Sequence, residues 1–201
     1  MSELLRVENL SVSFDTPRGE IQAVRGVSLA LSRGEVLAIV GESGCGKSVL
    51  CKAVMKLLPP TARIRAGRIF LNGTDITDYR EREMRKLRGR AFSMVFQDPM
   101  TALNPTIPVG RQIAEAVRAH NRRLPEAAVR QKVLALMELV GIERGAERYN
   151  LCPHSFSGGM RQRAVMAAAL AADPLLLFAD EPTTALDVTV QAQILDLLRE
   201  I

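Results

Sequence analysis

Two uninterrupted apolar runs, residues 36–40 and residues 175–179, most strongly constrain the fold of this chain. Strands that helices cover on both faces of a parallel sheet read as continuous apolar runs, whereas half-buried strands alternate apolar and polar residues. The first run lies between Gly34 and Gly41, and we expect a helix to follow it from Gly46 to about Leu58. The two runs therefore predict an α/β fold around a parallel sheet.

The eight residues after the first run fit the spacing G-x-x-x-x-G-K-[ST]. They are Gly41, Glu42, Ser43, Gly44, Cys45, Gly46, Lys47 and Ser48. Glycines let backbone N–H groups turn inward around phosphates, and the helix N-terminus adds partial positive charge. Lys47 is then suited to the β- and γ-phosphates, and the Ser48 hydroxyl to Mg²⁺. The alternative is an ordinary glycine-rich turn, but the strand, loop and helix order favours a nucleoside triphosphate site.

Polar residues follow two of the predicted strands. Asp180 and Glu181 come directly after residues 175–179, and Gln97 follows a shorter strand predicted at 91–96. Ligands of open α/β sheets bind at the carboxyl ends of the strands. We predict that Asp180 holds Mg²⁺, that Glu181 is the general base, and that Gln97 contacts Mg²⁺ or the attacking water. The alternatives are an acid pair that caps a helix and a surface glutamine.

A second anion-binding helix start is predicted at Ser157, Gly158 and Gly159, before an alanine-rich helix over about 160–172. A capped helix without a ligand is the alternative. One nucleotide needs only one such site, so the residues alone do not explain why the chain has two.

The rest of the chain predicts the surroundings of these motifs. Residues 5–14 and 27–31 alternate and predict antiparallel strands, and residues 67–73 predict another strand. Helical spacing of apolar residues predicts an inserted helical subdomain at 99–157, inside a single domain whose other parts are 1–98 and 158–201. A last helix is expected from Val188 to Ile201.

Composition excludes several classes of protein. The net charge of +5 is mixed with acids. The basic block at 79–90 has no aromatic residues interleaved among its arginines, so it predicts a solvated helix face and not a nucleic-acid site. No run approaches the roughly 20 apolar residues of a membrane span. The three cysteines have no metal-type spacing and fit a reducing cytoplasm.

Taken together, these motifs resemble the ATP-binding subunit of ABC transporters, from near the N-terminus to Ile201. Residues 96–105, 153–154, 157–163 and 180–193 are similar to the dipeptide, oligopeptide and nickel importer group. The resemblance implies a P-loop NTPase (RecA-like) core with an N-terminal antiparallel β subdomain and an inserted α-helical subdomain. It also implies ATP hydrolysis with Mg²⁺, in which two subunits enclose two nucleotides.

The resemblance assigns further roles. Ser157, Gly158, Gly159 and Met160 bind the ATP that the partner subunit holds, which accounts for the second helix start. Asp187 acts across the dimer, and Gln97 senses the membrane subunits. Phe14 stacks on adenine, with a packed core aromatic as the alternative. Val49 completes the set of nucleotide-binding residues that begins at Gly41.

Three departures accompany the resemblance. Met160 replaces the glutamine of most ABC proteins, as is usual in the peptide importer group, and Phe156 replaces leucine. The switch histidine of the family is missing, and neither His120 nor His154 is placed to replace it. We therefore expect the chain to be truncated at its C-terminus and to be a weak or inactive ATPase by itself. The missing segment would also hold the cysteine-rich tail found in some peptide importers.

The implied function is ATP-driven solute import, of peptides first, at the cytoplasmic face of the bacterial inner membrane. The implied partners are a second ATPase subunit, identical or different, transmembrane permease subunits, and indirectly an external solute-binding protein. No nucleic acid is expected. Two alternatives stay open: a soluble ABC ATPase that acts on ribosomes or nucleic acid, and a module that only binds nucleotide. The solute is not determined by these residues.

Overall fold

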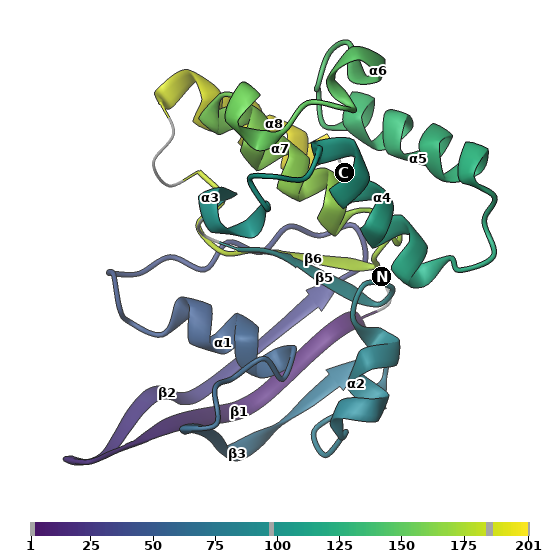
Figure 1. Ribbon diagram of the computed structural model, residues 1–201. Helices are drawn as coiled ribbons and strands as arrows, with labels where there is room; N and C mark the ends of the chain where they lie inside the picture. Colours follow the sequence, from purple (N-terminus) through teal and green to yellow (C-terminus); the bar gives the residue numbers. More distant parts are fainter. Residues whose placement is uncertain (1–2, 97–98, 184–186, 201) are drawn as a thin grey trace. The chain divides into compact units, whose positions relative to one another are not determined.

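The computed structural model describes residues 3–96, 99–183 and 187–200. The chain divides into two compact units, Met1–Arg88 and Gly89–Ile201, and each is described by itself. Figure 1 labels most of their helices and strands along the chain.

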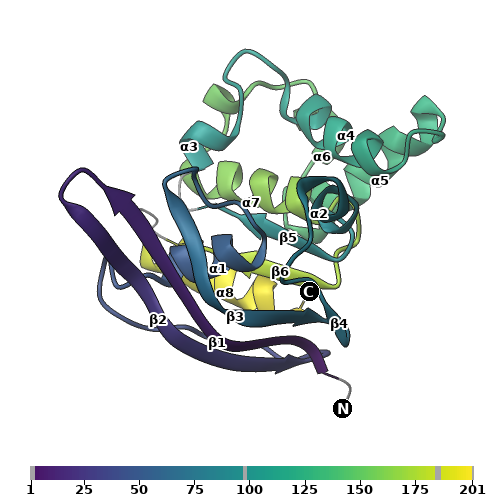
Figure 2. The ribbon, with the colours of Figure 1, turned by 90° about the horizontal axis from the view of Figure 1, so that it is seen from below.

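The first unit is built on an antiparallel sheet with the strand order β2-β1-β3-β4. The strands are β1 (Glu3–Thr16), β2 (Gly19–Ser32), β3 (Ala62–Leu71) and β4 (Thr74–Asp75). Figure 2 shows β1 between β2 and β3. Alternation along β1 places Leu5 and Val7 in the core, and after the register shift beyond Val7 it places Leu10 and Val12 there. The antiparallel strands predicted from the alternating sequence are confirmed.

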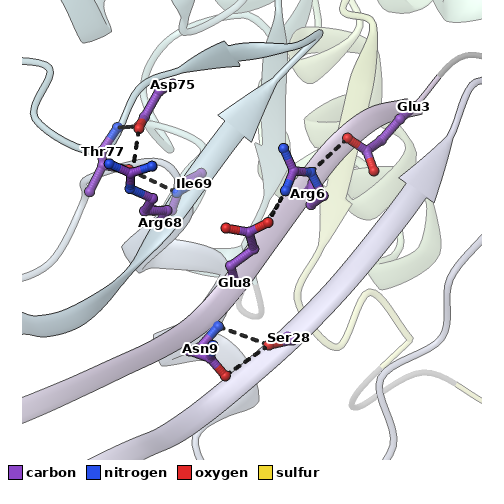
Figure 3. Close-up of polar contacts among 9 residues, drawn as sticks. All are labelled: Glu3, Arg6, Glu8, Asn9, Ser28, Arg68, Ile69, Asp75 and Thr77. Atoms are coloured by element: carbon purple, nitrogen blue, oxygen red, sulfur yellow. Dashed lines mark hydrogen bonds and ion pairs between the residues drawn. The ribbon is translucent and has the colours of Figure 1, made fainter.

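Polar side chains stabilise the exposed parts of this sheet (Figure 3). Arg6 forms ion pairs with Glu3 and Glu8 on its own strand. Asn9, at a shift in the β1 to β2 register, has a φ of 47° and donates its backbone N–H to Ser28 Oγ at 2.8 Å. The hydroxyl thus replaces a backbone acceptor where the ladder is interrupted.

Two helices belong to the first unit. Helix α1 (Lys47–Val54) packs on β1 and β2 and buries Leu50, Ala53 and Val54. It is shorter than predicted, since Met55 ends it and Lys56 has a φ of 51°. In α2 (Glu81–Leu87) only Met84 is buried, so the prediction of a solvated face for this basic block is confirmed.

The strand predicted at residues 36–40 is wrong. The structure leaves residues 35–42 outside any helix or strand, with side chains of Val36 and Val40 73% and 91% exposed. An apolar run becomes a strand only where a neighbouring strand accepts its hydrogen bonds. No strand among the described residues pairs with this segment, so apolar composition alone did not decide its structure.

The second unit combines a parallel strand pair with six α-helices in its described part. Strands β5 (Phe92–Val95) and β6 (Leu176–Ala179) pair in parallel, with Val95 opposite Ala179. The helices are α3 (Pro99–Ala102), α4 (Val109–His120), α5 (Glu126–Leu139), α6 (Gly145–Arg148), α7 (Gly158–Ala169) and α8 (Val188–Glu200), with a short 3₁₀ turn at Pro153–Ser155. The predicted helical stretch between Pro99 and Cys152 is helical as expected.

Helix α7 is central to this unit, because it contacts α3, α4, α5 and β5. Its buried face joins one apolar core with Ile113 of α4, Val133 of α5 and Ile194 of α8. The helix begins at Gly158, two residues before the predicted start. Among the described residues, no helix has the length and apolarity to cross a bilayer.

Candidate nucleotide site

The glycine-rich loop of the first unit leads into α1 as predicted. Residues 43–46 form a turn and bend, and Gly46, with a φ of 101°, is the residue before the helix. A Cβ at Gly46 would lie 2.4 Å from the Ala23 carbonyl oxygen on β2. Only glycine therefore fits here, because both the left-handed backbone and the close approach of β2 exclude a side chain.

Lys47 is the first residue of α1, and its ammonium lies against the loop. Its ammonium donates to the backbone carbonyls of Gly41 and Glu42 at 2.9 and 2.8 Å, and the Cys45 sulfur lies 3.9 Å away. The positive charge is thus held at the N-terminus of α1, where the helix dipole also favours an anion. Residues 41–45 are exposed, and Ser48 and Val49 are half-buried in the first turn of α1.

Phe14 is half-buried near the end of β1 in the same unit. It is paired in register with Ile21 of β2 and Ala62 of β3, and the Ile21 side chain is 58% exposed. An aromatic side chain next to exposed apolar surface suits a flat ring such as adenine, but it suits packing equally well. The adenine role of Phe14 stays a prediction.

Asp180 and Glu181 follow β6 in the second unit. Asp180 is 6% exposed, and its backbone N–H donates to the Val95 carbonyl at 3.0 Å, which extends the strand pairing by one residue. Glu181 is half-buried and has a φ of 48°, in a region that residues other than glycine rarely occupy. Such strained conformations gather at functional sites. Gln97, predicted to act beside them, lies outside the described residues.

The second predicted helix start is the N-terminus of α7. Ser157 is its N-cap, and the serine hydroxyl accepts a hydrogen bond from the Met160 backbone N–H at 3.3 Å. Ser157 and Gly158 are exposed, while Phe156 before them is 3% exposed and anchors the turn. The Met160 sulfur lies 3.4 Å from an Arg148 nitrogen. The first residues of the helix are therefore exposed to solvent, while Phe156 and Met160 beside them are held by contacts.

Asp187 caps α8. Its carboxylate accepts from the Val190 backbone N–H at 3.0 Å, and its carbonyl accepts from the Gln191 N–H at 2.9 Å. The Gln191 amide also donates to the Thr183 carbonyl at 3.2 Å. These bonds connect the first turn of α8 with the segment that follows Glu181, and the exposed Asp187 stands at the end of that connection.

Other polar groups lie outside the predicted set. An open hollow of about 450 Å³ in the first unit is lined by residues that include Lys56, Gly67 and Thr77, none of them a predicted site residue. The structure describes no group of three or more His, Cys, Asp or Glu side chains suited to a metal ion. Arg163, not predicted from the sequence, links α7 to two other helices. The sequence signal that could have identified Arg163 is its position one helical turn after Gly159.

Comparison with known proteins identifies a family and similar proteins for this chain. The family described as ABC transporter matches residues 24–184. The chain is 55% identical to the dipeptide transport ATP-binding protein DppD of Bacillus subtilis over 202 residues, which are 100% of this chain and 60% of that protein. It is 54% identical to the oligopeptide transport ATP-binding protein OppD of the same organism, covering 100% of this chain and 56% of OppD.

A solved structure agrees with the fold. The ATP-binding cassette MJ0796, in a dimeric post-hydrolysis state bound to ADP and Pi, superposes with a TM-score of 0.84 at 26% identity. The match covers 97% of this chain and 81% of that one. The predicted P-loop NTPase fold with its antiparallel sheet and helices is confirmed. The chain spans about three fifths of the length of DppD and OppD. It belongs to the ABC transporter family.

Proposed function

We propose that the complete protein binds and hydrolyses ATP and thereby powers peptide import. The observation that carries the proposal is Lys47, whose ammonium is held inside the glycine-rich loop by two backbone carbonyls. A fixed cation at a helix N-terminus suits the β- and γ-phosphates of a nucleotide. Peptide import rests on the relatives, whose names give dipeptide and oligopeptide transport. Neither name favours the ribosomal or nucleic-acid alternative.

The roles we propose follow the sequence motifs. Residues 41–49 hold the phosphates of the subunit's own nucleotide, with Phe14 against the adenine. Asp180, Ser48 and Gln97 hold Mg²⁺, for which carboxylate, hydroxyl and amide oxygens are suitable ligands. Magnesium would neutralise charge on the phosphate oxygens. Glu181 accepts the proton of the attacking water.

The partners are also part of this proposal. Residues 157–160 and Asp187 face the nucleotide of a second ATPase subunit, identical or different, so that two chains complete two sites. Support comes from the cassette MJ0796, which is dimeric with ADP and Pi. We further propose that residues 99–157 form the helical subdomain that meets the permease subunits, and that the protein is peripheral at the cytoplasmic face of the bacterial inner membrane.

Glu181→Gln tests the enzymatic part. In the complete protein, we expect the variant to bind ATP with unchanged affinity while phosphate release falls at least about 100-fold, because the general base is lost and the shape is kept. ATP should also shift the variant from monomer to dimer in native mass measurements. Ser93, half-buried in the neighbouring strand β5, pairs with Leu177, three residues before Asp180, so Ser93→Ala is a control. Equal phosphate release by Glu181→Gln would reject Glu181 as the base.

The transport part needs cells. Cells that depend on this protein for uptake should lose accumulation of a labelled dipeptide when Lys47→Ala replaces the wild type, while uptake of labelled nickel stays the same. Loss of nickel uptake with intact dipeptide uptake would contradict the peptide assignment and leave the ATPase assignment standing.

A further inference from the structure

Val190 of helix α8 lies against Gly159 in the first turn of α7. A Cβ on Gly159 would lie 2.7 Å from Val190 Cγ1, whereas nonbonded carbon atoms prefer about 3.5 to 4.0 Å. Val190 therefore packs against the bare backbone of Gly159. This contact lies inside one chain, so it demands glycine at position 159 for a reason separate from ligand binding.

Arg163 makes a second contact one helical turn further along α7. One guanidinium nitrogen donates to the Val140 carbonyl at 2.5 Å, and the other donates to Gln193 Oε1 of α8 at 2.9 Å. The planar guanidinium carries several donors in fixed directions, so it can serve both acceptors at once. Arg163 therefore connects the end of α5 to the middle of α8.

The end of α5 is arranged for this bond. The backbone N–H groups of Gly141 and Ile142 donate to the carbonyls of Glu138 and Met137, at 2.8 and 2.7 Å. This closing pattern satisfies those two carbonyls and leaves the Val140 carbonyl at the helix end. A side chain at Gly141 would collide with the guanidinium, 2.5 Å from the position of its Cβ.

The two contacts run in the same direction along both helices. Gly159 meets Val190, and four residues later Arg163 meets Gln193, three residues further on α8. Two contacts spaced by about one turn fix both the sliding and the rotation of one helix against the other. Val190 is also the residue whose N–H is capped by Asp187. A continuous chain of contacts thus joins the α7 start to Asp187.

We propose that Arg163 is a positioning residue, which with Val190 holds α7 and α8 in one register so that the helix start at 157–160 and Asp187 move as one body. The inference rests on the proposed function only for what these two elements face, namely the nucleotide of the second subunit. Its physical content, a rigid link between two segments, is independent of turnover.

Hydrogen exchange of the complete protein tests the link. Arg163→Lys keeps the charge but not the two-acceptor geometry, and Gln193→Ala removes the α8 acceptor. In both variants we expect exchange to rise at least about tenfold in residues 157–163 and 188–193, with no change in α4. Gln193→Glu, which strengthens the bond to Arg163, should keep wild-type exchange. Arg118→Lys, at an exposed pair with Glu126, is the matched control.

A size exchange tests the first contact. Gly159→Ala should raise exchange in residues 188–193, and the additional change Val190→Ala should restore it, because the smaller side chain makes room for the new methyl group. If Arg163→Lys and Gln193→Ala both leave residues 188–193 unchanged, the proposal is overturned. Failure of the rescue by Val190→Ala would likewise reject the contact as the reason for Gly159.

Turnover separates this proposal from the proposed function. Where the complete protein hydrolyses ATP, Gln193→Ala should lower kcat about tenfold and leave the ATP affinity of its own loop unchanged. Gln193→Glu should restore kcat. A wild-type protein without turnover would reject the ATPase function, and the exchange measurements would still decide the link. If Gln193→Ala changes hydrogen exchange but leaves kcat normal, the role of Arg163 as a positioning residue is rejected.

Discussion

The ammonium of Lys47 lies 2.8 Å from the backbone carbonyl oxygen of Glu42, within the loop that leads into α1. The loop thus holds its lysine in place before any phosphate is bound. We predict that Lys47→Ala lowers ATP affinity of the complete protein at least about tenfold, since a charge-assisted hydrogen bond contributes about 1.5 to 3 kcal/mol. Titration with a fluorescent ATP analogue measures this. Lys52→Ala, later on the same helix, should bind normally, and equal loss in both variants would contradict the prediction.

Gly46 and Gly44 allow the steric part of the loop to be isolated. Both have positive φ, 101° and 78°, but a Cβ at Gly46 would lie 2.4 Å from the Ala23 carbonyl, while a Cβ at Gly44 would have nothing within 4 Å. We predict that Gly44→Ala costs about 1 kcal/mol of unfolding free energy, from backbone strain alone. Gly46→Ala should cost about 3 kcal/mol. Urea unfolding measures both, and equal losses would show that β2 does not constrain Gly46.

Glu20 makes the first unit sensitive to acid. The hydrogen bond from the Ser13 hydroxyl, and then Arg65 nearby, lower the pKa of Glu20 below its ordinary value of 4.5. A carboxyl with a lowered pKa stabilises the fold above 4.5, and this stability is lost as the pH falls through the folded-state pKa. We predict that the melting temperature of Glu20→Gln changes less between pH 6 and pH 3 than that of the wild type. Glu115→Gln, an exposed change on α4, serves as the control, and identical pH profiles for wild type and Glu20→Gln would contradict the prediction.

Gln162 is buried in α7 at 1% exposure, and its Nε2 finds no hydrogen-bond partner among the residues that the structure describes. A buried donor without a partner costs about 1 to 3 kcal/mol. Gln162→Met, which keeps the length of the side chain, should therefore raise the melting temperature. Gln112→Met should lower it, because that amide donates to the carbonyls of Asn104 and Ile107. Parallel losses in both variants would mean that the Gln162 amide is satisfied.

Local pattern predicted the strands for which the structure provides a partner strand. The alternation of β1 and β2 was sufficient because a short turn joins the two strands, and the run before Asp180 was sufficient because β5 pairs with it. The same reasoning failed for residues 36–40, because no strand among the described residues pairs with them, and an apolar run does not itself show whether a partner strand is present. The end of α1 differed from the prediction because Lys56, just after it, adopts a left-handed conformation.

The candidate site was predictable at the level of motifs and not of geometry. Spacing predicted Lys47 and Ser157 as phosphate-binding residues, because helix starts that bind anions have a local signature. Asp187 was assigned by the family resemblance and not by spacing. Spacing could not identify the positive φ of Glu181. It also could not identify the contacts of Arg163, which depend on how α7 packs against α8 and the end of α5. Arginine is abundant in this chain, so residue type alone did not distinguish position 163 from the solvated arginines of α2.

The exposed Val36 and Val40, which precede the glycine-rich loop, should affect the behaviour of this chain in solution. Residues 36–40 offer backbone donors and acceptors together with water-exposed aliphatic side chains, and such a segment is a template on which another molecule can add a strand. Preparations of the 201-residue chain should therefore self-associate as protein concentration rises, and aggregation, not loss of the fold, should set the highest concentration at which nucleotide binding is measurable.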